Sequence, residues 1–201
     1  MPLEPFPLVL ASRSPHRLKL LEDAGLAVEA VAASVDERAV EAAVGGELEP
    51  SDLASLLAET KAIDVSPRRM GRFVIGADQV LELDGEVLHK VDDMEGARRR
   101  LLALQGRTHH LHSAVVVARD GRVVWRGLET ASMTMRSLTP AQIGQHLAEA
   151  GSGVLGSVGA YQIENVGVRL FERIEGDWWT VIGLPLLPLL AALREHGALD
   201  D

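Results

Sequence analysis

The 201-residue sequence contains no cysteine. This absence excludes a disulfide scaffold, a zinc site built from thiolates and a cysteine nucleophile, and it fits a protein kept in a reducing compartment. The chain also lacks an excess of basic residues, because 20 Lys and Arg stand against 29 Asp and Glu, a formal net charge of −9. A general nucleic-acid binder needs a basic surface, so we expect no nucleic-acid partner. A local basic cluster could still bind a small anion.

Long hydrophobic runs are missing too. The longest, Leu184–Leu193, is about half the length that a membrane span needs and contains two prolines. The apolar stretch at residues 7–11 is too short for the core of a signal peptide. We therefore expect no membrane partner and a cytoplasmic protein. With 47% hydrophobic residues the chain can bury a core, and its length predicts one domain, residues 1–201.

Helix and strand patterns are mixed along the chain. Asp84-Gly85 and Asp120-Gly121 predict two β-hairpins. We expect the glycine-rich stretch 151–159 to be a loop, and the basic run Arg98–Arg100 to be a solvated helix face. The pattern predicts an α/β fold, with a mixed, partly antiparallel sheet flanked by helices. The expected strands are 8–10, 27–32, 73–83, 87–88, 108–119, 123–135 and 181–182, and the expected helices are 15–24, 52–65, 92–104, 140–150 and one ending near 196.

The turn between the first strand and the first helix has the composition of an anion site. Ser12 and Ser14 can donate hydrogen bonds, Arg13 and Arg17 supply charge, and the helix that begins at Pro15 points its positive end at the same place. These features are typical of phosphate binding. A capped helix with two surface arginines would have the same sequence.

Three further charged residues are candidates for the same site, and two of them stand in apolar surroundings. Lys61 falls on the apolar stripe of its helix, where it either extends outward to solvent or reaches a pocket that holds negative charge. Asp78 interrupts an apolar strand and is either a ligand or general base, or a strand-end residue bonded to nearby backbone. Lys90 follows the first hairpin and could return close to Asp78. Together with Glu37, these residues are the types of side chain that cleavage of a polyphosphate with a divalent metal requires.

The histidine cluster His109, His110 and His112 offers an alternative metal site. Two of these residues, His110 and His112, share one strand face at a spacing that a metal could use. No third ligand is evident nearby, so a polar exposed face is the favoured interpretation.

The sequence resembles the Maf family of nucleotide pyrophosphatases over nearly its whole length. The resemblance implies an α/β fold with two lobes around a central cleft, a homodimer, and hydrolysis of a nucleoside triphosphate to the monophosphate and pyrophosphate. It also implies a divalent cation, Mg²⁺, Mn²⁺ or Co²⁺. The motifs occur in order at Leu10–Arg17, Val35–Glu37, Leu57–Ala62, Gly76–Val80, Leu88–Lys90, Gly159–Tyr161 and Gly183–Pro185.

The resemblance assigns roles to single residues. Asp78 matches the proton acceptor of the family, and Glu37 matches an acidic residue on the metal side, so both are the expected catalytic and metal-binding residues. The phosphate-handling positions correspond to Ser12, Arg17, Lys61 and Lys90, to which the composition of the turn adds Arg13.

Departures from the family pattern concern the nucleobase. Many Maf proteins that act on dTTP and UTP carry Arg, Thr and Gln where this chain has His16, Gln79 and Glu164. Gln79, Glu164 and the run 170–176 are more similar to the branch that acts on 7-methyl-GTP. An acidic Glu164 could accept hydrogen bonds from guanine and favour a cationic methylated purine, and the imidazole of His16 could stack on a base. Val91 replaces a proline that usually follows the lysine.

The sequence therefore predicts a pyrophosphatase in which Asp78 orients or deprotonates a water that attacks the α-phosphorus. Two alternatives stay open. One is a pyrophosphatase of the dTTP and UTP kind or of broad range. The other is a non-catalytic regulator of septum formation that binds nucleotide.

Overall fold

Seven strands form one mixed sheet in the computed structural model, which describes residues 8–44 and 48–199. Their order is β2-β1-β3-β5-β6-β7, and β4 pairs with the C-terminal end of β3. Both pairings of β1 are parallel, and the pairings from β3 to β7 are antiparallel, which confirms the predicted mixed α/β sheet. The strands are β1 (Leu8–Ala11), β2 (Val28–Ala30), β3 (Phe73–Leu83), β4 (Glu86–Leu88), β5 (Thr108–Arg119), β6 (Arg122–Met135) and β7 (Phe171–Glu175).

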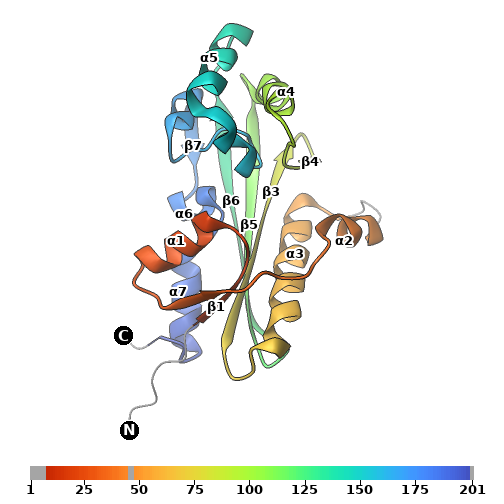
Figure 1. Ribbon diagram of the computed structural model, residues 1–201, viewed down its shortest axis with the longest axis vertical. Helices are drawn as coiled ribbons and strands as arrows, with labels where there is room; N and C mark the ends of the chain where they lie inside the picture. The colour runs from red at the N-terminus through yellow and green to blue at the C-terminus, as the bar shows by residue number, and fades with distance from the viewer. Residues whose placement is uncertain (1–7, 45–47, 200–201) are drawn as a thin grey trace.

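Helices cover both faces of this sheet (Figure 1). Successive strand residues point to opposite faces, so Val115 packs with α1 and α7, whereas Ala114 and Val116 pack against α3. None of the described helices is both long enough and apolar enough to cross a membrane. The helices are α1 (Pro15–Asp23), α2 (Glu37–Ala43), α3 (Pro50–Val65), α4 (Met94–Leu104), α5 (Pro140–Ala150), α6 (Trp178–Ile182) and α7 (Leu186–Glu195), with short 3₁₀ turns η1 (Ser66–Arg68), η2 (Gly151–Gly156) and η3 (Val166–Leu170).

Long strands link two cores. The lower lobe is the part of the molecule in which β1, β3 and β5 pack with α1, α3 and α7. The upper lobe is the part in which Leu81 of β3, Leu111 of β5 and Met133 of β6 pack with α4 and α5 (Figure 1). Because β3 belongs to both, its middle residues lie at the junction of the two lobes.

The close approach of α3 to β3 is made possible by Gly76. A Cβ atom at this position would lie 2.2 Å from the carbonyl oxygen of Ala58 and 2.7 Å from the backbone nitrogen of Ala62. Asp78 points to the same face of β3, two residues further on. The contact therefore sets how near Lys61 of α3 comes to Asp78.

Two local predictions were wrong, and one helix was not predicted. Val181 and Ile182, predicted as a strand, belong to α6, because Asp177 accepts a hydrogen bond from the Thr180 backbone nitrogen at 3.0 Å and caps a helix instead. The stretch predicted as a loop from Gly151 begins with the 3₁₀ turn η2. Helix α2 was not predicted; its N-cap Asp36 accepts a hydrogen bond from the backbone nitrogen of Ala39.

Candidate active site

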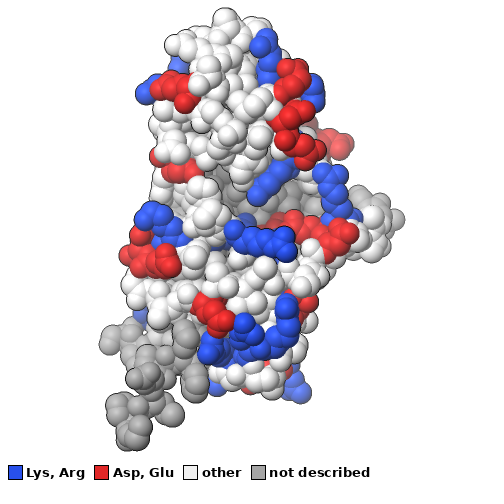
Figure 2. All heavy atoms as spheres, viewed as in Figure 1, with Lys and Arg blue, Asp and Glu red and all other residues white. Residues whose placement is uncertain are grey.

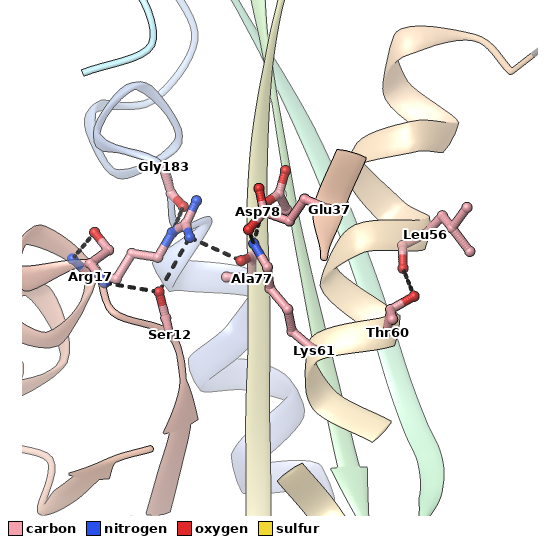
Figure 3. Close-up of polar contacts among 10 residues, drawn as sticks. Ser12, Arg17, Glu37, Leu56, Thr60, Lys61, Ala77, Asp78 and Gly183 are labelled. Carbon is pink, nitrogen blue, oxygen red and sulfur yellow. Dashed lines mark hydrogen bonds and ion pairs between the residues drawn. The ribbon is translucent and has the colours of Figure 1, made fainter. Parts of the chain in front are cut away.

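The turn from β1 into α1 is built around Arg17. Ser14 caps α1 by accepting a hydrogen bond from the Arg17 backbone nitrogen, and Ser12 accepts one from the Ser14 nitrogen at 3.1 Å. The Arg17 side chain donates from Nε to the carbonyl of Gly183 at 2.8 Å and from Nη1 to the carbonyl of Ala77 at 2.9 Å (Figure 3). The guanidinium thus ties the turn to β3 and to the end of α6.

Lys61 joins the two carboxylates that the sequence singled out. Its Nζ lies 2.5 Å from Oδ1 of Asp78 and 2.6 Å from Oε1 of Glu37 (Figure 3). Lys61 is 8% exposed and Asp78 is 7% exposed, so this contact is buried on the Asp78 side. Of the two expectations for Lys61, the pocket with negative charge is the one observed. Asp36 places Glu37 here by beginning α2 at that residue.

Burial and charge change the acidities of these groups. Burial raises the pKa of Asp78, although the charges of Lys61 and Arg17 oppose it. Burial also acts to raise the pKa of Glu37, but the hydrogen bond and charge of Lys61, with the charges of Arg17 and Lys90, bring it below its ordinary value. Burial lowers the pKa of Arg17 and that of Lys90, and for Lys90 the charge of Arg17 adds to the effect. Asp78 is therefore the carboxylate more ready to accept a proton at neutral pH.

All of these groups line a single cleft of about 870 Å³. Figure 2 shows the hollow between the upper and lower parts of the molecule, with basic and acidic side chains along its rim. The cleft brings together all ten residues predicted from the sequence, which are Ser12, Arg13, His16, Arg17, Glu37, Lys61, Asp78, Gln79, Lys90 and Glu164.

The three residues expected at the nucleobase line the same cleft. His16 Nδ1 is 3.3 Å from Oε1 of Glu164, so a residue of α1 meets one that follows Tyr161 in the upper lobe. The amide nitrogen of Gln79 donates to Ser113 Oγ at 3.0 Å and to the carbonyls of Thr180 and Val181. These bonds fix Gln79 against α6 through its amide nitrogen, and none of them involves its amide oxygen.

A comparison with known protein families identifies the chain. Residues 7–196 match the family model described as Maf-like protein. The chain belongs to the Maf-like family. It is 59% identical over 194 residues to a 7-methyl-GTP pyrophosphatase of Mesorhizobium japonicum, with 96% of this chain and 98% of the relative covered. It is 53% identical to a 7-methyl-GTP pyrophosphatase of Brucella suis (96% and 98%) and 50% identical to a nucleoside triphosphate pyrophosphatase of Caulobacter vibrioides (96% and 97%).

The carboxylates of this Maf-like protein suit the divalent cation that the family resemblance implies. Asp78 and Glu37 each direct one oxygen to Lys61, and the second oxygen of each takes no part in that contact. Mg²⁺ and Mn²⁺ prefer oxygen donors, and Mg²⁺ is commonly held by one or two carboxylates together with substrate phosphates. Within residues 8–44 and 48–199, no group of three or more histidine or carboxylate ligands could hold a metal ion. The pair fits a hard cation that arrives with a nucleotide.

The histidine cluster of the Maf-like chain is less exposed than predicted. His109 is fully buried and its Nε2 lies 3.1 Å from the hydroxyl of Tyr161, which lines the cleft. His112 is buried as well, and its Nε2 lies 3.2 Å from Glu82, next to His110. The prediction of an exposed face is therefore wrong for His112, and His109 lies on the opposite, buried face of the strand. Burial lowers the pKa of His109 to about 3.

We expect His109 to make the fold sensitive to mild acid. The unfolded chain protonates this histidine near pH 6.5, whereas the folded protein does so only near pH 3, so the free energy of unfolding falls as the pH decreases between these values. His109 alone should account for a loss of about 2 kcal/mol between pH 7 and pH 5. Urea unfolding at both pH values measures it. His109→Phe should lose correspondingly less, while His196→Gln, at an exposed position, should behave like the wild type. An equal loss in wild type and His109→Phe would contradict the assignment.

Proposed function

We propose that this protein hydrolyses a nucleoside triphosphate to the nucleoside monophosphate and pyrophosphate, with 7-methyl-GTP as the preferred substrate. The observation that carries the proposal is the contact of one buried lysine with two carboxylates in a cleft lined by further cations. Relatives named for this activity support the reaction class.

The chemical step is an attack of water on the α-phosphorus. Asp78 accepts the proton of the attacking water, and the bond between the α-phosphorus and the bridging oxygen breaks, so that pyrophosphate leaves with that oxygen. Lys61 fixes the orientation of the Asp78 carboxylate through the 2.5 Å contact. A positioned general base of raised pKa suits proton transfer near neutral pH.

The cations act on the phosphates. Lys90 and Arg13 line the cleft and balance the charge of the β- and γ-phosphates. The Ser12 hydroxyl, whose oxygen accepts a hydrogen bond from the Ser14 nitrogen, donates a hydrogen bond to a phosphate oxygen. Arg17 adds positive charge close to Asp78 while its bonds to two carbonyls keep it in place. Preorganised charges of this kind stabilise the charge that develops in the transition state. A divalent cation held by Glu37 and Asp78 supplies Lewis-acid polarisation of the phosphoryl oxygens when bound.

The base end is formed by Glu164 and His16. Glu164 accepts hydrogen bonds from the N1–H and amino group of guanine, and its charge favours the cationic 7-methyl base. His16, 3.3 Å from Glu164, offers a ring for stacking. Gln79 contributes its amide oxygen to the same side of the cleft.

A nucleotide panel tests the proposed activity. Pyrophosphate and monophosphate are measured with 7-methyl-GTP, GTP, dTTP and UTP, in the presence of Mg²⁺, Mn²⁺ or Co²⁺. We expect release of pyrophosphate that depends on the metal, and the highest kcat/KM for 7-methyl-GTP. Preference for dTTP or UTP, or equal rates throughout, would instead support the pyrimidine-directed or broad-range alternative. Binding without turnover would support a regulator of septum formation.

We expect Glu164→Gln to reduce the preference for the methylated base. The substitution keeps the shape of the side chain but removes its charge, and a hydrogen bond to a charged group is worth about 1.5–3 kcal/mol, or roughly 10- to 100-fold in affinity. The ratio of kcat/KM for 7-methyl-GTP to that for UTP should fall by about tenfold or more. Glu195→Gln, at an exposed position at the end of α7, is the control. An unchanged ratio would rule out this role for Glu164.

Three expectations beyond the site belong to the same proposal. The protein acts as a single domain of residues 1–201, forms a homodimer and works in the cytoplasm, where nucleotides are available. Light scattering of the purified chain measures its oligomeric state directly, and a monomeric mass would overturn the dimer.

A further inference from the structure

Arg100 differs from the two arginines that precede it on α4. Arg98 and Arg99 are exposed, and Arg99 lies 3.5 Å from Glu95 one turn earlier on the helix surface. The Arg100 side chain instead donates from Nη1 to the carbonyl of Val158 at 2.6 Å and from Nη2 to the carbonyl of His89 at 2.7 Å. The prediction of a solvated face therefore holds for the first two residues and is wrong for Arg100.

The two carbonyls belong to segments that line the cleft from different parts of the chain. His89 immediately precedes Lys90, the lysine proposed for the phosphates. Val158 begins the stretch that continues through Tyr161 to Glu164, the residue proposed for the base. A single guanidinium therefore connects the main chain next to Lys90 to the main chain that leads to Glu164.

The chemistry of the guanidinium suits a fixed connection. Its nitrogens lie in one plane, so two carbonyls bound to two of them are held at a set distance and angle, a geometry that the rotatable ammonium of a lysine does not impose. No carboxylate lies within ion-pair distance of Arg100 in the described part of the chain, as the ion pairs there involve other residues. The Arg100 side chain is therefore held by hydrogen bonds to two carbonyls and not by a salt bridge.

A second contact links the same segment to the catalytic side. Nε2 of His89 lies 3.3 Å from Oε1 of Glu41, one turn after Glu37 on α2. His89 is thus held through its carbonyl by α4 and through its ring by the helix that carries Glu37. A shift of His89 would change the position of Lys90 relative to both α4 and α2.

We infer that Arg100 is a positioning residue, which holds the phosphate-binding segment at Lys90 and the base-binding stretch ending at Glu164 at the separation that one bound nucleotide requires. Arg100 itself does not contact the nucleotide. The inference rests on the proposed function of this cleft, since it takes a nucleotide as the ligand.

The affinities for a complete nucleotide analogue and for its two fragments test this role. Calorimetry with Mg²⁺ compares three probes, which are pyrophosphate, 7-methylguanosine and the non-hydrolysable α,β-methylene analogue of 7-methyl-GTP. Arg100→Gln should weaken binding of the whole analogue by about tenfold or more, because its two ends no longer meet both subsites at once. Each fragment should bind within about threefold of the wild type. Arg99→Gln is the matched control, and it should leave all three affinities unchanged.

The conservative variant separates geometry from charge. Arg100→Lys keeps the charge and the aliphatic stem but not the two-point connection, so it should lose affinity for the whole analogue nearly as much as Arg100→Gln, and its thermal stability reports whether the fold survives. Loss of pyrophosphate binding alone would indicate a direct phosphate contact and overturn the inference, as would wild-type affinity in Arg100→Gln or full rescue by lysine. If the wild type binds the analogue but hydrolyses no nucleotide, the proposed function fails while this comparison still decides the role of Arg100.

Discussion

Asp78→Asn is expected to lower kcat for pyrophosphate release by about a thousandfold, with the fold intact. An asparagine keeps the size of the side chain but cannot accept a proton from water, and general-base catalysis typically contributes 10²–10⁴-fold. It also removes one of the two negative charges against Lys61, so the lysine stays paired with Glu37 alone. Steady-state kinetics with 7-methyl-GTP measures the loss.

A control variant and two further measurements distinguish a loss of catalysis from a loss of folding. Asp23→Asn changes a carboxylate of the same size in an exposed pair with Lys19, and it should leave kcat within about twofold of the wild type. Thermal unfolding and the affinity for the α,β-methylene analogue should show that Asp78→Asn still folds and binds. Turnover by Asp78→Asn close to the wild-type rate would exclude Asp78 as the base.

Gly76→Ala is expected to destabilise the protein by about 3 kcal/mol or more, an effect at the upper end of overpacking substitutions. The added methyl group would lie 2.2 Å from the carbonyl oxygen of Ala58 and 2.8 Å from the Cβ of Ala62, so α3 must move away from β3. Because Lys61 follows the helix, its contact with Asp78 should lengthen and kcat should fall as well. Urea unfolding and steady-state kinetics measure the two effects.

Gly144→Ala is the control for this substitution, and its expected effect has the opposite sign. Gly144 lies inside α5, where an added Cβ would meet only Arg98 Nη1 at 4.0 Å. Alanine is the better helix former by about 0.8–1 kcal/mol, so the variant should be slightly more stable and equally active. Similar stability of the two variants would show that α3 does not depend on the missing side chain at position 76.

The main features of the sheet and most helices follow from local patterns. Turn dipeptides and alternating apolar residues were sufficient for β3, β5 and β6, which are long and carry strong signals. Val181 and Ile182 suggest a strand because β-branched residues favour strands. The helix forms there instead because the Asp177 carboxylate accepts hydrogen bonds from both the backbone nitrogen and the hydroxyl of Thr180.

The site was predictable as a list of residues and not as a set of contacts. Helical spacing placed Lys61 on an apolar face, yet it could not say whether the ammonium extends to solvent or reaches Asp78, because the answer depends on how α3 packs. Arg100 looked like one of three surface charges, since its partners are backbone carbonyls, which every residue possesses. The burial of His109 could not be predicted for a similar reason. Alternate residues of a strand face opposite sides of the sheet, and only the fold determines which side is buried.

Asp78 and Gln79 are neighbours on β3 whose side chains point to opposite sides of the sheet, one toward Lys61 and the other toward α6. Because the two residues are adjacent, a shift of β3 that moves Gln79 relative to α6 also moves Asp78 relative to Lys61. A substitution that repositions α6 through Gln79 is therefore expected to change the contact of Asp78 with Lys61 as well.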